Sequence, residues 1–196
     1  MNISVLSSAH SLVLNESVYK TLSSNKYRPL YLHEWLLYLD KNLPLANKAE
    51  IKEKQQTIIV QLLGLFNSFP GPPIRQLIAK SIANLYSLGD ILTLYQTIEK
   101  CNDLLKSKEH ETQMNQIAKL CALNVLGCLY EKLGRMCGTS YEETVQILIK
   151  YMKSADSLVR IEIVQTFEKI LSGLGNAGQS VHKDIYKQLK NLIQDR

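Results

Sequence analysis

Six residues near the end of the chain have the spacing of a dinucleotide-binding loop. Residues 173–178, GLGNAG, match the Gly-x-Gly-x-x-Gly pattern, whose backbone N–H groups approach a pyrophosphate. That chemistry requires a β-strand before the first glycine and a helix that opens within the motif. Here a helical pattern precedes the glycines, and no alternating strand pattern occurs in the sequence. We therefore interpret this segment as a loop between helices and expect no bound cofactor.

Histidines and cysteines, which most often ligate metals or take part in catalysis, are dispersed along the chain. Structural zinc requires four converging ligands, and the spacing of these residues predicts no such cluster. We expect no metal site. Cys121 and Cys128 lie seven residues apart on one predicted helix, and we interpret these two as small core residues. The cysteine pattern as a whole fits a reducing compartment. The residues concerned are His10, His33, His110, His182, Cys101, Cys121, Cys128 and Cys137.

No group of residues has the sequence signature of a catalytic site. The chain contains neither a nucleophile elbow nor a Gly-Lys-Ser phosphate loop. The adjacent Glu142 and Glu143 fall in the first turn of a predicted helix, where the helix dipole favours negative charge without any catalytic role. We therefore expect that the protein is not an enzyme.

The clearest pattern in the chain is one amphipathic helix that occurs three times. The copies start at Arg75, Lys119 and Arg160, which are 44 and then 41 residues apart. At 3, 4, 7, 10 and 11 residues after each start every residue is apolar, and these offsets share one face of a helix. The residues are Ile78, Ala79, Ile82, Leu85 and Tyr86; Ala122, Leu123, Leu126, Leu129 and Tyr130; and Ile163, Val164, Phe167, Ile170 and Leu171. A period of about 40 residues is typical of two-helix repeats of the HEAT and armadillo type.

The breaks between apolar segments predict an all-α chain of about nine helices. The expected helices cover residues 8–22, 29–42, 49–67, 72–89, 90–106, 112–136, 140–153, 156–173 and 180–194. Asp90 and Asp156 are predicted to cap the fifth and eighth of these. The partner helices also repeat, because Tyr141, Val145, Ile149 and Met152 recur 40 residues later as Val181, Ile185, Leu189 and Leu192.

These patterns predict a HEAT/armadillo-like α-solenoid of stacked antiparallel helix pairs. We expect one solenoid segment over residues 1–196, with amino-terminal helices over 1–69 and regular HEAT-like repeats over 70–196. The last predicted helix has no partner helix after it, and an uncovered solenoid end exposes apolar surface. The segment is therefore expected to belong to a longer solenoid.

The composition is that of an ordinary globular chain. Hydrophobic residues make up 45%, which is too many for a disordered protein, and no stretch approaches the roughly 20 apolar residues that cross a bilayer. The start of the chain does not have the pattern of a secretory signal, which predicts a cytoplasmic protein. The net charge of +5 is spread over the helices rather than clustered. A salt-sensitive binder of anionic lipid or nucleic acid stays an alternative, although no nucleic-acid partner is expected.

A few polar and aromatic residues are candidates for contacts between repeats or with partners. Asp156 and Arg160 could link neighbouring repeats through charge-assisted hydrogen bonds, and Arg75 has the same register; the alternative is that these charges are solvated. Trp35, the only tryptophan, is interpreted as a core residue, with an exposed binding anchor as the alternative. Lys132 and Arg135, together with Lys108, are candidates for a small basic contact site or for stabilising a helix C-terminus.

Eight strings of residues carry a family resemblance when they are read in order. They are AHSLVLNES, HEWLLYLDK, ANKAEIKEKQ, FPGPPIRQLIAKSIANLYSLGD, QTIEKCNDLLKSK, LYEKLGRMCG, KSADSLVRIEI and LSGLGNAGQSVHKDIYK. Together they resemble the amino-terminal region of the HEAT-repeat-containing protein 5 family, over residues 9–196. Members of that family are similar to the yeast large alpha-helical accessory protein of the clathrin adaptor.

The resemblance implies a very large α-solenoid of which this chain would be the amino-terminal part. It implies a non-catalytic scaffold in vesicle traffic between the trans-Golgi network and endosomes, with endocytosis-related protein transport as the setting. The implied partners are the type 1 clathrin adaptor complex, aftiphilin and gamma-synergin. The implied location is cytoplasmic and peripheral on the trans-Golgi network, endosomes or clathrin-coated vesicles. No catalytic or cofactor-binding residue is implied, and self-association of a scaffold arm stays an alternative.

Overall fold

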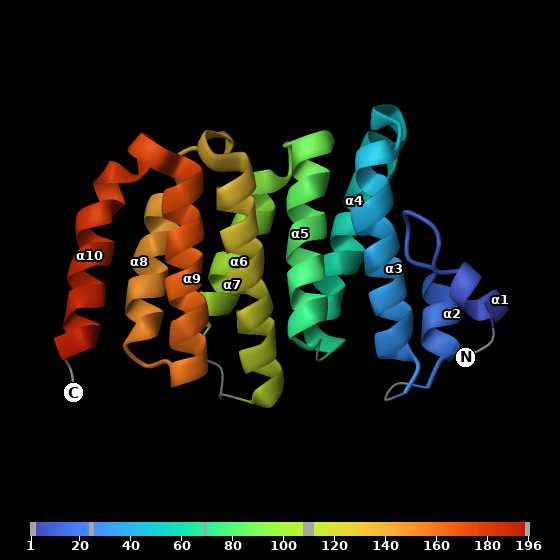
Figure 1. Cartoon of the computed structure of the whole chain (residues 1–196), viewed down its shortest axis with the longest axis horizontal. Coiled ribbons are helices and arrows are strands. Elements are labelled where there is room, and N and C mark those ends of the chain that lie inside the picture. The colour runs from blue at the N-terminus through green and yellow to red at the C-terminus, as the bar shows by residue number, and fades with distance from the viewer. Residues whose placement is uncertain (1–2, 24–25, 69, 108–111, 195–196) are drawn as a thin grey trace. The chain divides into compact units, whose positions relative to one another are not determined.

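The chain is all-helical over residues 3–23, 26–68, 70–107 and 112–194, which are the residues that the computed structural model describes (Figure 1). Nine helices of six residues or more lie in these ranges, in agreement with the predicted number, and one short helix precedes them. Four short 3₁₀ segments join or extend them. The helices are α1 (Ile3–Ser7), α2 (Glu16–Thr21), α3 (Arg28–Asn42), α4 (Lys48–Gly64), α5 (Pro72–Leu88), α6 (Leu94–Lys106), α7 (Gln113–Leu133), α8 (Ser140–Met152), α9 (Ser157–Leu174) and α10 (Gln179–Gln194).

The chain divides into two compact units, Met1–Ile91 and Leu92–Arg196. The first copy of the repeated helix, α5, lies in the first unit, and the second and third copies, α7 and α9, lie in the second. The division between amino-terminal helices and regular repeats at residue 69/70 stays a prediction. None of the helices in the described ranges is long and apolar enough to cross a bilayer.

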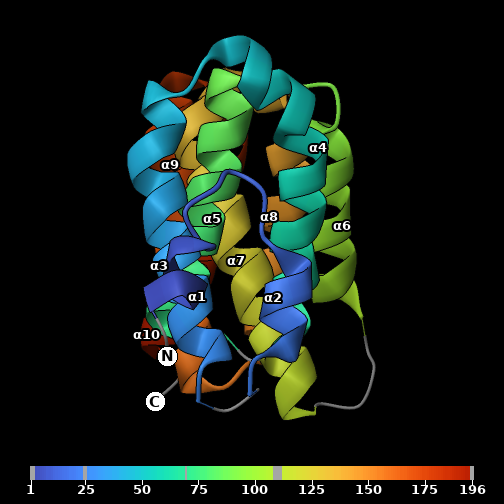
Figure 2. The same cartoon turned by 90° about the vertical axis from the view of Figure 1, so that its right-hand side faces the viewer.

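In the first unit, α5 contacts both α3 and α4, and Figure 2 shows it between them. Pro72 and Pro73 open α5, because a proline in the first turn lacks only an N–H that would have no partner there. All five repeated apolar positions of α5 are buried, and they form the centre of this unit together with Trp35, Leu36 and Leu39 of α3.

The first predicted helix, residues 8–22, is wrong over half of its length. The structure has α1, then an irregular segment, and then α2, which begins only at Glu16. Asn15 ends the irregular segment because its side chain accepts a hydrogen bond from the Val18 N–H and so caps α2. Ala9, Leu12 and Leu14 are buried without a helix, so their apolar character reflects packing rather than helical periodicity.

The predicted helix cap at Asp90 is also wrong, since α6 begins four residues later at Leu94. The Asp90 backbone is held instead by the buried side chain of Gln55 on α4. The Asp90 N–H donates to Gln55 Oε1 at 2.7 Å, and Gln55 Nε2 donates to the Asp90 carbonyl at 2.6 Å. Both backbone groups are therefore paired by one side chain, and the turn after α5 is fixed to α4.

In the second unit, consecutive helices pair and alternate helices stack. The pairs α6–α7 and α8–α9 are in contact, and so are α6–α8, α7–α9 and α8–α10. The helices α7 and α9 therefore form one row, and α6, α8 and α10 form the other (Figure 1). The predicted cap at Asp156 is confirmed, because its carboxylate accepts from the Val159 N–H at 2.8 Å at the start of α9.

Two glycines allow α7 and α9 to approach closely. A Cβ on Gly173 of α9 would lie 2.0 Å from the Tyr130 carbonyl oxygen of α7, and a Cβ on Gly127 of α7 would lie 3.0 Å from the Lys169 side chain of α9. Gly134, at the end of α7, has φ of 49°, a conformation that glycine adopts without steric cost. Small residues at these positions thus allow a short distance between α7 and α9, which are neighbours in the same row.

Candidate functional site

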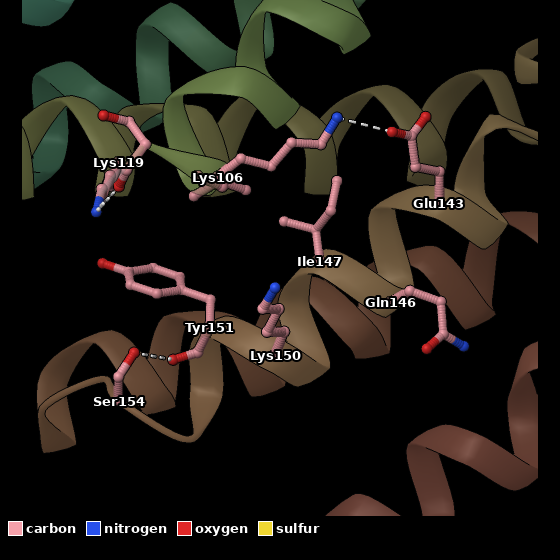
Figure 3. Close-up of a pocket in the computed structure, with 10 residues that line it drawn as sticks. Lys106, Lys119, Glu143, Gln146, Ile147, Lys150, Tyr151 and Ser154 are labelled. Carbon is pink, nitrogen blue, oxygen red and sulfur yellow. Dashed lines mark hydrogen bonds and ion pairs between the residues drawn. The ribbon is translucent and has the colours of Figure 1, made fainter. Parts of the chain in front are cut away.

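A cavity of about 540 Å³ opens between the C-terminal end of α6, the first third of α7, and α8. It lies wholly within the second unit, and Figure 3 shows the residues around it. Three of its lining residues are lysines and one is a glutamate; the others are apolar or neutral polar. The lining residues are Leu105, Lys106, Ser107, Lys119, Glu143, Gln146, Ile147, Lys150, Tyr151 and Ser154.

An ion pair at one end of the cavity joins α6 to α8 (Figure 3). Lys106 Nζ lies 2.8 Å from Glu143 Oε1, and 3.5 Å from Asp103 Oδ1 on its own helix. The hydrogen bond to Glu143 raises the pKa of Lys106 above its usual value, so this ammonium stays charged at neutral pH. Both side chains are about half exposed, and solvent screening leaves such a pair little net stabilising effect.

Lys119 of α7 lies at the other end, and it is the buried charge of the site. Only 7% of this residue is exposed. Its ammonium donates to the Ser107 carbonyl at 3.0 Å and lies 5.0 Å from the centre of the Tyr151 ring. Both of these partners are neutral, although the electron-rich ring face attracts a cation. Lys119 therefore brings a positive charge to the cavity wall without a carboxylate partner among the described residues.

The α8 side of the cavity combines apolar surface with a third lysine. Ile147 and Tyr151 are half-buried, and Lys150 between them is exposed. In Figure 3 the Lys150 side chain points from α8 toward the middle of the cavity, between Ile147 and Tyr151. Leu105 from α6 is buried and contributes apolar surface from the opposite side. An apolar surface thus lies within reach of three ammonium groups.

A second, smaller cavity of about 200 Å³ continues past Lys119 and Tyr151 toward the start of α9. Its charge is different, since Asp156 is among its lining residues. The Asp156 carboxylate caps α9 and also accepts a hydrogen bond from the Gln116 side chain of α7. Lys119 and Tyr151 therefore stand between a cavity with excess positive charge and one that contains a carboxylate.

The predicted ladder of aspartate and arginine residues takes a different form. The polar link from Asp156 runs to Gln116, while Arg160 is exposed, and no ion pair joins either arginine to an aspartate within the described ranges. Arg75 is 9% exposed, and its Nη1 donates to the Pro70 carbonyl at 3.2 Å, just before its own helix. Arg75 thus stabilises the entry to α5 instead of linking it to a neighbouring repeat. Lys119, in the same register, lines the cavity.

Trp35 is not a partner-binding anchor, because it is fully buried. Its Nε1 donates to the Ser11 carbonyl at 3.1 Å, so the side chain fixes the irregular segment before α2 against α3. This outcome confirms the interpretation of Trp35 as a core residue. Lys132 and Arg135 are both exposed at the end of α7, away from the residues that line the cavities. Lys108, the third member of that candidate contact site, lies outside the described residues.

The glycine-rich segment has a structural role that accounts for its pattern. It spans the last turn of α9 and a 3₁₀ segment, Gly175–Gly178, so a helix precedes it as predicted. Its first glycine, Gly173, provides the close approach to Tyr130. No strand lies beside it within the part of the chain that the structure describes, and we assign it no cofactor.

The cysteines and histidines do not form a metal-binding group among the described residues. Cys121 is buried, which confirms its prediction as a core residue, whereas Cys128 is only half-buried. Cys101 and Cys137 are also buried, and burial raises the pKa of both of these thiols to about 12. Such thiols are not nucleophilic at neutral pH. His10 pairs with Glu34 at 2.8 Å and stacks on Tyr38, whereas His110 lies outside the described residues.

The sequence did not predict the cavity. Lys106, Lys119 and Lys150 lie on three different helices, so no local spacing relates them. One signal was present: Lys119 occupies the first position of the repeated helix, where the other two copies have arginine. The shorter, more flexible ammonium at this position can turn toward Tyr151, which the repeat alignment alone does not indicate.

No model of a known protein family matches the chain. No solved structure matches it either. The resemblance to the HEAT-repeat-containing protein 5 family therefore stays a prediction that rests on the residues alone.

Proposed function

We propose that this chain is a non-catalytic segment of a HEAT-type α-solenoid that binds protein partners in clathrin-adaptor-dependent vesicle traffic. The observation that supports a repeat architecture is the register of the hydrogen bonds between stacked helices. Gln116 bonds to Asp156, Asn124 to Glu162, and Gln146 to Asp184, at separations of 40, 38 and 38 residues. Similar separations along both rows are what equivalent, stacked hairpins produce.

The traffic setting and the partners come from the sequence resemblance. The proposed partners are the type 1 clathrin adaptor complex, aftiphilin and gamma-synergin, and the proposed location is the cytoplasmic surface of the trans-Golgi network and endosomes. A long helical surface suits this role, because such surfaces bind other macromolecules along their length. The absence of enzymatic activity belongs to the same proposal.

The test is direct binding with purified components. The chain is immobilised and incubated separately with recombinant adaptor complex, aftiphilin and gamma-synergin. We expect at least one of the three to bind. Circular dichroism confirms that the chain is folded, and a longer chain of the same protein is the positive control. If the longer chain binds these partners and the folded chain binds none of the three, the partner site does not lie in these residues.

A second candidate function, self-association, is favoured by one exposed face of α9. In the repeat register, Leu158, Ile161 and Val164 of α9 correspond to Ile117, Leu120 and Leu123 of α7, which is the helix that α9 covers. Leu123 is fully buried, whereas Val164 is 38% exposed, Ile161 54% and Leu158 71%. An exposed apolar stripe of this kind can be covered by a further hairpin or by a second copy of the chain.

The concentration dependence of the molecular mass tests this second candidate. If copies associate through α9, Ile161→Lys makes the chain monomeric at concentrations where the unchanged chain is dimeric. Leu92→Lys is the matched control, because Leu92 is 83% exposed and lies outside α9, in the turn before α6. A monomeric unchanged chain at high concentration would argue against self-association.

A further inference from the structure

The larger cavity of the second unit has a chemistry that defines its ligand. Its described lining carries three lysines and one glutamate, and that glutamate is already paired with Lys106. Lys119 is buried, and its contacts among the described residues are to neutral groups, namely the Ser107 carbonyl and the Tyr151 ring. A buried ammonium is strongly stabilised by an anionic partner that approaches it. The cavity is therefore complementary to a carboxylate.

Charge alone does not describe the site, because apolar surface lies between the lysines. Leu105, Ile147 and the Tyr151 ring line the same space. A free inorganic anion would leave these groups without a partner, whereas an aliphatic side chain would bury them. The volume of about 540 Å³ lies in the range of small-ligand sites, roughly 300–1,000 Å³, and accommodates a few side chains. The combination fits a peptide in which acidic and aliphatic residues are neighbours.

The position of the carboxylate within the site also follows from the charges. The smaller cavity beyond Tyr151 contains Asp156, whose carboxylate disfavours a second negative charge there. On the other side, Lys150 is exposed and points into the larger cavity (Figure 3). An acidic side chain that enters from solvent thus meets Lys150 first and Lys119 behind it.

We propose that this cavity binds a short segment of a partner protein in which an aspartate or glutamate lies next to a leucine or a similar aliphatic residue. The carboxylate pairs with Lys150 and Lys119, and the aliphatic side chain packs on Leu105 and Ile147. This inference deepens the proposed function, since it assigns the chemistry of one partner contact. It is measured with peptides and the purified chain, so it can fail or succeed independently of the three named partners.

The experiment titrates the whole chain with fluorescently labelled peptides at physiological ionic strength. The probe alternates aspartate with leucine. One control peptide has asparagine in place of each aspartate, and another has serine in place of each leucine. We expect sub-millimolar binding of the probe and at least tenfold weaker binding of both controls.

Charge-reversal variants then locate the site on the protein. Lys150→Glu should weaken probe binding at least tenfold, because it places a negative charge where the carboxylate enters. Lys153→Glu is the matched control: it makes the same charge change one turn along, at an exposed residue that does not line the cavity, and should change the affinity less than twofold. Both positions are exposed, so neither change is expected to unfold the chain.

Three outcomes would overturn the proposal. The first is no binding of the probe by the folded chain at millimolar peptide. The second is an equal loss from Lys150→Glu and Lys153→Glu, which would show attraction to overall charge only. The third is displacement of the probe by phosphatidylserine vesicles, together with vesicle binding that Lys150→Glu abolishes, which would assign the site to a membrane surface instead.

Discussion

Gly173→Ala tests the closest helix contact in the second unit. The added Cβ would lie 2.0 Å from the Tyr130 carbonyl oxygen and 2.7 Å from Glu131 Cα, and both are backbone atoms of α7 that no side-chain rotation can move. To reach an ordinary contact, α7 and α9 must separate locally by about 1 Å or more. Overpacking of this kind costs ~3 kcal/mol at the upper end of its usual range. Alanine regains ~1 kcal/mol of helix propensity over glycine, so we expect a net loss of ~2 kcal/mol.

Urea unfolding followed by circular dichroism measures this loss. With an m-value of ~2 kcal/mol/M, the midpoint should fall by ~1 M. Gly64→Ala is the matched control: Gly64 is the last residue of α4, and its added Cβ meets no atom within 4 Å. That variant should be neutral or slightly more stable. If Gly173→Ala were as stable as Gly64→Ala, the helices would not approach as described, and the explanation of the glycine-rich segment would be incorrect.

Three further changes test other features of the fold. Gln55→Leu should destabilise the first unit by about 2–4 kcal/mol, because it removes both hydrogen bonds between the Gln55 side chain and the Asp90 backbone. Trp35 fluorescence during urea unfolding measures this loss, and an unchanged midpoint would contradict the prediction. Thr144→Val removes the hydroxyl that hydrogen-bonds to the buried Tyr130 hydroxyl at 2.8 Å. It should lower the free energy of unfolding, measured with urea, by about 1–3 kcal/mol. Ser154→Ala is the exposed control and should not change stability. The free energy of unfolding should also fall as the pH rises from 9 toward 12. Burial raises the pKa of the Cys101 thiol from 9.0 to about 12, so the folded state binds this proton more tightly than the unfolded state does. The resulting stabilisation is complete only below pH 9 and is lost as the pH rises through the folded-state pKa. Cys101→Ala should make that slope shallower by up to about 1.4 kcal/mol per pH unit, and equal slopes in urea titrations at several pH values would refute the assignment.

The helical class and most helix positions follow from local information in the sequence. The five apolar offsets after Arg75 and Lys119 correspond to buried residues of α5 and α7, since a one-sided apolar helix must cover that side. Prolines and a capping aspartate identify the starts of α5 and α9 because their effect is confined to one turn. The segment before α2 was predicted wrongly since Leu12 and Leu14 are apolar for packing, and helical spacing over a short segment does not distinguish the two causes.

The candidate site depended on the tertiary structure. Repeat register identified Lys119 as a position of interest, but its partners, Ser107 and Tyr151, are set by how α6, α7 and α8 pack. The same holds for Asp156, whose capping role is local and predictable, while its bond to Gln116 joins two helices 40 residues apart. Side chains that converge from separate helices leave no fixed spacing in a sequence.

By itself, the sequence determined most of the helical segments, which face of each repeated helix is apolar, and where several helices begin, since all three depend on neighbours within a few residues. The tertiary structure alone decided that Gln55 hydrogen-bonds to the turn at Asp90, that Gly173 allows the close approach of α7, and that three lysines surround an apolar cavity. These features arise from contacts between residues that are distant in the chain. Their geometry depends on the packing distance and rotation of whole helices, and neither is specified by the residues of one helix.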